Sequence, residues 1–268
     1  MKIAVFGDNK PLLDILRAKG VELSIFGVDF LSWEDFPKDA RLLLTLGGDG
    51  TFLKSLSLVR DSGVPIAGIN FGRLGFLTAA KAGEGENSWI DRLVEGDYTV
   101  EERQLLKVES DALPEGFYPY AGNECSIQRQ GASMLAIDVR LDGRPIPTYW
   151  ADGIVTATPT GSTAYSLSVG GPIVMPGSEV FILAPIAPHN LNMRPIVVPQ
   201  DSVIDMVFTA REGNAVLTVD NRSVVLPSGS NIRILKGDYG FRYVSLSDNT
   251  FINALRTKLL WGEDRRNR

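Results

Sequence analysis

Hydrophobic residues in the first hundred positions follow two alternating patterns. Between short apolar runs, they recur at intervals of three and four, the spacing of a helix face, as in residues 12–16. Strands are predicted at residues 3–6, 21–26, 42–46 and 64–69, and the continuous apolar run at 42–46 is typical of a strand covered on both faces. Strands separated by helices predict an α/β domain with a parallel sheet over residues 1–100.

After about residue 100, short alternating or β-branched runs replace the helical spacing. Examples are residues 134–141, 203–208 and 215–219, and turn residues such as Lys236-Gly237-Asp238 separate such runs. This pattern predicts a C-terminal all-β, sandwich-like domain over residues 101–249. Helical spacing returns at 250–262, and we expect that helix to pack back on the first domain.

Composition and charge limit the cellular location and the partners that we expect, but they do not indicate the chemistry. With 268 residues and 44% hydrophobic composition, the chain is expected to be globular and soluble. Its formal net charge of −5 argues against non-specific nucleic-acid binding. Its single cysteine excludes an internal disulfide, and no apolar run approaches the ~18 residues of a membrane span. We therefore expect a cytoplasmic protein with neither nucleic-acid nor membrane partners.

The most informative segment is Gly-Gly-Asp-Gly-Thr at residues 47–51, between a predicted buried strand and a predicted helix. Ligands of open parallel sheets bind beyond the carboxyl ends of the strands. Glycines let backbone N–H groups approach a ligand closely, and a helix N-terminus favours negative charge. We therefore predict that Gly47, Gly48 and Thr51 bind phosphate.

Asp49, inside this turn, is not explained by phosphate binding, because a carboxylate repels an anion. It suits a general base acting on a hydroxyl, or a group that holds Mg²⁺ bridging phosphates. The alternative is a helix N-cap in a tight turn. The segment matches neither G-x-G-x-x-G nor the Walker pattern, which argues against a Rossmann dehydrogenase and a P-loop ATPase.

Further polar residues occur in the second predicted domain. Asn123 and Glu124 offer donors and acceptors that suit paired hydroxyls, such as those of a ribose. Asp152 precedes a predicted strand, and a hydroxyl-rich turn at 158–166 leads into a helix. The plainer alternative for this turn is a capped helix. The pair Asp220-Asn221 is best interpreted from sequence as a hairpin turn.

Two residues of the loop at 68–77 admit alternatives. Phe76 either stacks on a base or belongs to the core, and Arg73 either meets a phosphate or is solvated. His189 is the only histidine, so we expect no transition-metal site. Mg²⁺ carried by nucleotide phosphates is the expected cation.

Together, the turn at 47–51, the Asn-Glu pair at 123–124, Asp152-Gly153 and the segment 158–165 resemble the NAD kinases. The resemblance extends from about residue 40 to 225. It implies an enzyme that phosphorylates the 2′-hydroxyl of the adenosine ribose of NAD, with ATP or another phosphoryl donor and Mg²⁺. It also implies an N-terminal α/β domain that binds nucleotide, a β-rich domain that binds NAD, and a homodimer or homotetramer.

The same resemblance assigns roles to single residues. Asp49 corresponds to the catalytic base, and Asp152 to an acid at a subunit interface. The residues it implies for NAD binding are Gly50, Phe76, Asn123, Glu124, Asp152, Thr163, Ala164, Tyr165, Ser168, Ala187 and Asn221. Relatives usually have Asp-Gly where this chain has Asp220-Asn221, and many have a basic residue at the position of Trp150.

Three alternatives remain open on sequence grounds. A lipid kinase or a sugar kinase shares the glycine–aspartate turn. A dinucleotide sensor without activity is possible as well, although Asp49, Asn123 and Glu124 are all present and argue against it.

Overall fold

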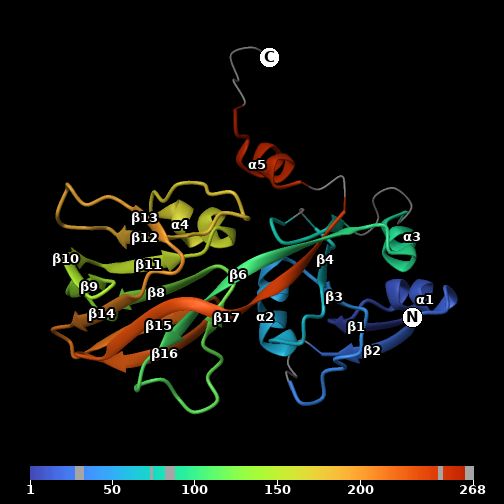
Figure 1. The fold of residues 1–268 in the computed structure, drawn as a ribbon, viewed down its shortest axis with the longest axis horizontal. Coiled ribbons are helices and arrows are strands. Elements are labelled where there is room, and N and C mark those ends of the chain that lie inside the picture. The colour runs from blue at the N-terminus through green and yellow to red at the C-terminus, as the bar shows by residue number, and fades with distance from the viewer. Residues whose placement is uncertain (28–32, 73–74, 82–87, 247–249, 263–268) are drawn as a thin grey trace. The chain divides into compact units, whose positions relative to one another are not determined.

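The computed structural model describes residues 1–27, 33–72, 75–81, 88–246 and 250–262 (Figure 1). The chain forms two compact units, one of residues 1–102 and 241–268, and the other of residues 103–240. The chain passes from one unit to the other within β6 (Thr99–Glu109) and back within β17 (Asn231–Ser245). Arg73, for which the sequence leaves phosphate contact and solvation equally open, lies outside the described residues.

The first unit is built on parallel strands in the order β4-β3-β1-β2, with β5 and the end of β17 beside β4. All five residues of β3 are buried, because helices cover both faces of the sheet. On one face, the rings of Tyr243 and Phe241 lie 6.0 and 5.8 Å from that of Phe52 in α2. The elements are β1 (Lys2–Phe6), α1 (Lys10–Ala18), β2 (Glu22–Phe26), β3 (Leu42–Leu46), α2 (Asp49–Val59), β4 (Ile66–Asn70), β5 (Ala80–Lys81), α3 (Ser88–Glu95) and α5 (Phe251–Leu259).

The second unit contains two layers of strands. One layer has the order β10-β9-β14-β17, with β6 next to β17 and β7 next to β6, and the other has the order β13-β12-β11-β8-β15-β16. Neighbours in the second layer are antiparallel. The elements are β7 (Tyr120–Ala121), β8 (Glu124–Arg129), β9 (Leu135–Leu141), β10 (Arg144–Ala151), β11 (Gly153–Ala157), α4 (Tyr165–Ser168), β12 (Val180–Ile186), β13 (Ile196–Pro199), β14 (Ile204–Thr209), β15 (Asn214–Val219) and β16 (Arg222–Pro227).

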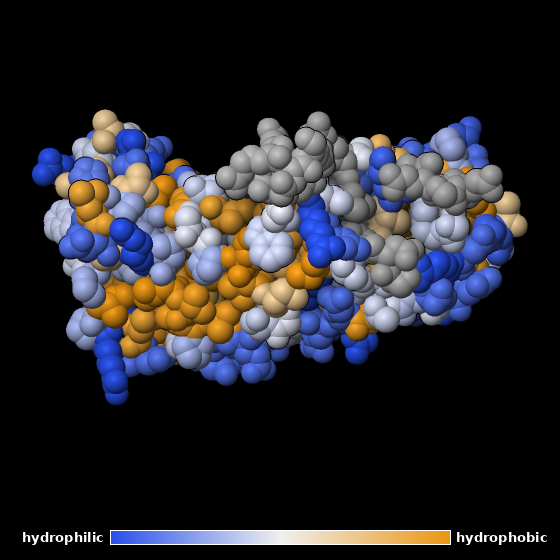
Figure 2. All heavy atoms as spheres, turned by 90° about the horizontal axis from the view of Figure 1, so that it is seen from above, coloured by the Kyte–Doolittle hydropathy of each residue, from blue (hydrophilic) through white to orange (hydrophobic). Residues whose placement is uncertain are grey.

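Hydrophobic side chains also remain on the surface of the β-rich unit. Figure 2 shows a broad hydrophobic area on this unit. Its exposed large hydrophobic residues include Trp150, Met175, Leu191 and Val197. In the part of the chain that the structure describes, no helix has the length and apolar character that crossing a membrane requires.

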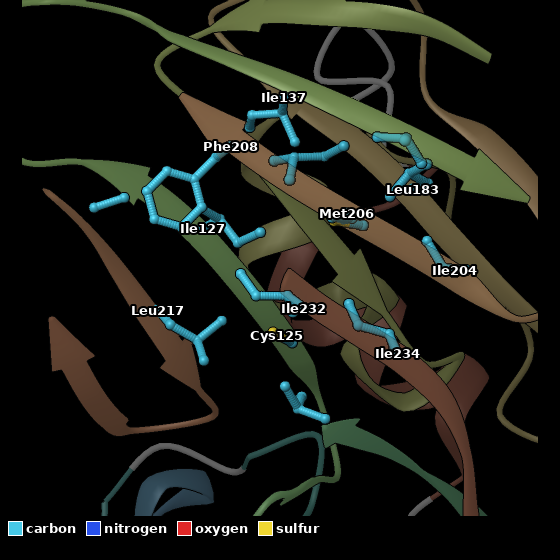
Figure 3. Packing of buried hydrophobic residues seen from close by; sticks show 14 of the residues in the cluster. Cys125, Ile127, Ile137, Leu183, Ile204, Met206, Phe208, Leu217, Ile232 and Ile234 are labelled. Carbon is cyan, nitrogen blue, oxygen red and sulfur yellow. The ribbon is translucent and has the colours of Figure 1, made fainter. Parts of the chain in front are cut away.

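The core of the β-rich unit lies between its two layers (Figure 3). Ile137 of β9 and Phe208 of β14 point inward from one layer and meet Ile127 of β8 and Leu217 of β15 from the other. Cys125 is fully buried in this core, which raises the pKa of its thiol. Alternation along the strands places these side chains on a shared inner face.

One predicted turn is wrong. Lys236-Gly237-Asp238 lies inside the continuous strand β17 rather than between two strands. Gly237 is there because the backbone of β6 comes close: a Cβ on it would lie 2.9 Å from the carbonyl oxygen of Leu105. A glycine inside a strand often marks such an approach, and sequence alone does not separate this case from a turn.

Candidate functional site

The turn at 47–51 lies where β3 ends and α2 begins. Gly48 is the N-cap of α2 and supplies no side-chain cap, whereas Asp49 and Gly50 are the first two residues of the helix. The N-cap alternative for Asp49 is therefore wrong. The N–H groups of Gly47 and Thr51 donate to the carbonyls of Ile69 and Gly48 at 2.9 and 3.0 Å. The first N–H groups of a helix otherwise lack intrahelical partners, so this end of α2 suits an anion.

The Asp49 carboxylate is held by backbone far along the chain. It accepts hydrogen bonds from the N–H of Phe76, 2.8 Å from Oδ2, and from the N–H of Leu77, 3.0 Å from Oδ1. Gly75 lies so close that a Cβ on it would overlap Asp49 Oδ1. The carboxylate is thus fixed in orientation, while about a third of its side-chain surface stays accessible.

Phe76 is half-buried next to this carboxylate. The centroid of the Phe76 ring lies 6.0 Å from that of Phe251 in α5. The Lys258 ammonium group lies 4.4 Å from the centroid of the same Phe76 ring. Gly47 is placed for close packing, because a Cβ on it would overlap the side chain of Thr51. Asp49, Phe76 and the glycine turn therefore form one cluster in the α/β unit, which also includes the C-terminal helix.

A second cluster lies in the β-rich unit, where Asn123 directly precedes β8 and Glu124 begins it. The Thr158 hydroxyl donates to the Gly122 carbonyl at 2.6 Å, and the Thr158 N–H donates to the Asn123 carbonyl at 2.8 Å. Gly161 packs so tightly that a Cβ on it would overlap the Asn123 carbonyl oxygen. These contacts bring the hydroxyl-rich turn against the Asn-Glu pair.

Glu124 has an unusual environment for a carboxyl group. Burial, followed by the neighbouring Asp220, raises its pKa to about 7, and the backbone N–H of Tyr165 lowers it. Its Oε2 is buried and has no hydrogen-bond partner among the described residues. A ribose hydroxyl is the kind of donor that such an oxygen accepts.

Asp220 plays a part that sequence reasoning missed. Its carboxylate has no exposed surface and accepts the backbone N–H groups of Gly122, Asn123 and Glu124 at 2.9, 2.8 and 3.2 Å. Arg222 lies 3.9 Å from it. Although the pair at 220–221 does join β15 to β16, Asp220 also holds the segment that carries Asn123 and Glu124. Its short-range pattern is that of any hairpin turn, so no sequence signal distinguishes it.

Other residues predicted to bind NAD lie in the hydroxyl-rich turn, in α4 and in the turn after β15. Thr163 and Ala164 are half-buried at the end of the hydroxyl-rich turn, and Ser168 is exposed at the end of α4. The Tyr165 hydroxyl is 3.4 Å from the Gln128 side-chain oxygen. Asn221 is exposed in its turn.

Asp152 and Ala187 lie at one end of β11 and β12. The Asp152 carboxylate pairs with Arg129 Nε at 2.8 Å, and each side chain is about one-third exposed. Ala187 follows β12 with a positive φ of 45°, which is uncommon for a non-glycine residue. Asp152 thus already has a cationic partner within its own chain.

Comparison with known proteins matches both units of the chain. The family model for the ATP-NAD kinase N-terminal domain matches residues 33–98, and the model for the ATP-NAD kinase C-terminal domain matches residues 122–246. An NAD kinase of Cytophaga hutchinsonii is 40% identical, with 97% of this chain and 88% of that protein covered. An NAD kinase of Bacteroides fragilis is 41% identical, with 99% of this chain and all of that protein covered.

A solved structure is similar over nearly its full length. The NAD kinase of Archaeoglobus fulgidus, in complex with ATP, has a TM-score of 0.80 and 32% identity, with 97% of this chain and 99% of that chain covered. The match therefore includes both the glycine–aspartate turn and the β-rich unit.

Proposed function

The chain belongs to the NAD kinase family and phosphorylates NAD, and we propose that Asp49 takes the proton from the ribose 2′-hydroxyl during that transfer. The lipid-kinase, sugar-kinase and sensor alternatives find no support, because both family models and the relatives described are NAD kinases. ATP is the phosphoryl donor, in keeping with the ATP complex of the Archaeoglobus enzyme.

The proposal rests on the way in which the Asp49 carboxylate is held. Two backbone N–H groups orient its carboxylate within the phosphate turn, and each oxygen keeps a further lone pair for a hydroxyl donor. Phosphoryl transfer depends mainly on positioning and on charge stabilisation, so a fixed carboxylate matters more than a strong base. The hydroxyl attacks the γ-phosphorus, its proton passes to Asp49, and the bond to the leaving ADP oxygen breaks.

In this proposal the α/β unit, over residues 1–102 and 241–268, binds the donor phosphates, and the β-rich unit binds NAD. Gly47, Gly48 and Thr51 border the phosphates, with Gly50 beside the nucleotide. Asn123 and Glu124 bind the ribose hydroxyls, and Asp152 and Ala187 face the nicotinamide half. Thr163, Ala164, Tyr165 and Ser168 are proposed to bind the adenine side of NAD, as is Phe76 of the α/β unit. Asn221 is proposed to bind NAD as well.

Mg²⁺ fits this arrangement as a companion of the donor phosphates. The described residues contain no group of three or more His, Cys, Asp or Glu side chains that could hold a metal. Magnesium commonly uses one or two carboxylates plus phosphate oxygens, and Asp49 is the carboxylate of the phosphate turn. When bound, Mg²⁺ neutralises charge on the transferred phosphoryl group.

The direct test is product formation. With ATP, Mg²⁺ and NAD, the purified protein should form NADP, measured with an NADP-specific dehydrogenase, and EDTA should abolish the signal. Diacylglycerol or glucose in place of NAD should yield no phosphorylated product. NAD binding without NADP formation would instead favour a sensor.

The raised pKa of Glu124 predicts that NAD binding depends on pH. Because its pKa is about 7, the carboxyl group gains charge, and with it acceptor strength, as pH rises through that value. At saturating ATP, kcat/KM for NAD should therefore rise from pH 6 to about pH 8 and then level off. Glu124→Gln should remove this inflection and lower kcat/KM by ~10-fold or more, the scale of a lost charge-assisted hydrogen bond.

The exposed Glu179 provides a matched control for this experiment. Glu179→Gln should keep the wild-type pH profile. If the inflection persisted in Glu124→Gln, the titration would belong to another group and the assignment of Glu124 would be wrong.

We also propose a cytoplasmic homodimer or homotetramer. The hydrophobic area on the β-rich unit supports self-association, because contiguous apolar surface commonly marks an interface (Figure 2). Light scattering of the purified protein measures the mass, and a monomer at micromolar concentration would contradict the proposal.

A further inference from the structure

The C-terminal helix α5 brings a cation to the catalytic carboxylate. Lys258 Nζ lies 3.7 Å from Asp49 Oδ2 and 4.4 Å from the centroid of the Phe76 ring. The distance to Asp49 exceeds that of a good hydrogen bond, so the ammonium is near the carboxylate without being fully engaged by it. Lys258 thus contacts two residues of the proposed site.

The helix is anchored so that this side chain faces inward. Ala254 and Leu255, four and three positions before Lys258, are buried, and residues at this spacing share a helix face. Thr250 caps the first turn by accepting the N–H of Asn253. Arg256, in the same last turn, is exposed on another face. The position of Lys258 is therefore set by the packing of α5.

Partial burial of the Lys258 ammonium group costs free energy. The Lys258 side chain is only 23% exposed, and burial lowers the pKa of its ammonium group, while Asp49 raises it. Burial of a charge is tolerated when the charge is paired, and Asp49 provides one negative charge at 3.7 Å. An ammonium has three N–H donors, so further acceptors can be bound.

We propose that Lys258 is a phosphate-binding residue of the transfer site, which contacts the terminal phosphate of the donor and stabilises the charge on it during transfer. This proposal rests on the proposed function of Asp49. The glycine turn supplies N–H groups but no cationic side chain, and its one charged residue, Asp49, repels phosphate. Lysine is a common phosphate ligand that acts as a point charge, and its place beside Asp49 offsets that repulsion.

The test compares Lys258→Met with Arg256→Met, which removes an exposed cation from the same helical turn. Lys258→Met should lower kcat by ~10²–10³, the scale seen when one charge-stabilising donor is removed. It should also weaken binding of inorganic tripolyphosphate in calorimetry by ~10-fold. Lys258→Arg should recover part of kcat, because it restores the charge, whereas Arg256→Met should match the wild type in every measurement.

A purely structural role would produce a different result. If Lys258→Met lowered the melting temperature but kept wild-type kcat and tripolyphosphate affinity, the proposal would be overturned. Absence of NADP formation by the wild-type enzyme would refute the proposed function itself, so the two failures are distinguishable.

Discussion

Asp49→Asn should lower kcat by ~10²–10⁴ while the protein stays folded and binds NAD with unchanged affinity. Asparagine keeps the size of the side chain but cannot accept the proton of the ribose hydroxyl. The loss should appear in kcat rather than in KM for NAD, because ground-state contacts to the dinucleotide are proposed to lie with other residues. Steady-state kinetics together with calorimetric titration of NAD separate the two quantities.

Asparagine also introduces one mismatch, which the design of this experiment must cover. Both Asp49 oxygens accept a backbone N–H, from Phe76 and Leu77, and an amide nitrogen cannot accept either bond. A melting curve of the variant therefore accompanies the kinetics. The exposed Asp61 serves as the matched control, since Asp61→Asn removes the same charge from a surface position of the same unit. Near wild-type kcat in Asp49→Asn would refute the assignment of the base.

Gly75→Ala should lower kcat by ~10² without removing any functional group. The added Cβ would overlap Asp49 Oδ1 and lie 2.6 Å from Asp49 Cγ, so the carboxylate must turn or shift. A misplacement of about 1 Å at a reacting group can cost that much in rate. Affinity for NAD should fall less than kcat, because Gly75 lies next to Asp49 and Phe76, whereas the Asn-Glu pair belongs to the other unit.

Gly72→Ala is the matched control in the same loop. Among the residues that the structure describes, a Cβ on Gly72 meets only Asn70 Oδ1, at 3.7 Å, which is ordinary contact. Its kcat should stay near the wild-type value. If Gly75→Ala retained full activity with a normal melting temperature, the orientation of the Asp49 carboxylate would not limit the reaction.

Residues far away in the chain set the geometry of both clusters, through backbone N–H groups in the α/β unit and through a side chain in the β-rich unit. In the α/β unit, the key carboxylate is oriented by backbone N–H groups 27 and 28 residues further along the chain. In the β-rich unit, the Asn-Glu pair is held by Asp220, 97 and 96 residues further along. Each proposed functional side chain is thus positioned by residues far from it in the chain.

The sequence by itself determined the features that depend on near neighbours. The pattern at 42–59 predicted that Asp49 lies in a glycine turn between a buried strand and a helix. In the structure, β3 is that strand and α2 is that helix. The same short segments carried the resemblance to NAD kinases, and the comparisons bear out that family. Such features could be predicted because backbone preferences and hydrophobic spacing act over a few residues.

Only the tertiary structure decided which distant residues meet. Lys258 reaches Asp49, and Asp220 reaches Asn123, through packing between elements that are far apart in the chain. Gly237 continues a strand rather than forming a turn, because β6 lies against it. A single lysine, aspartate or glycine has the same local pattern in many proteins. Its role depends on burial and on partners brought near by the fold, and neither is encoded within a short window of sequence.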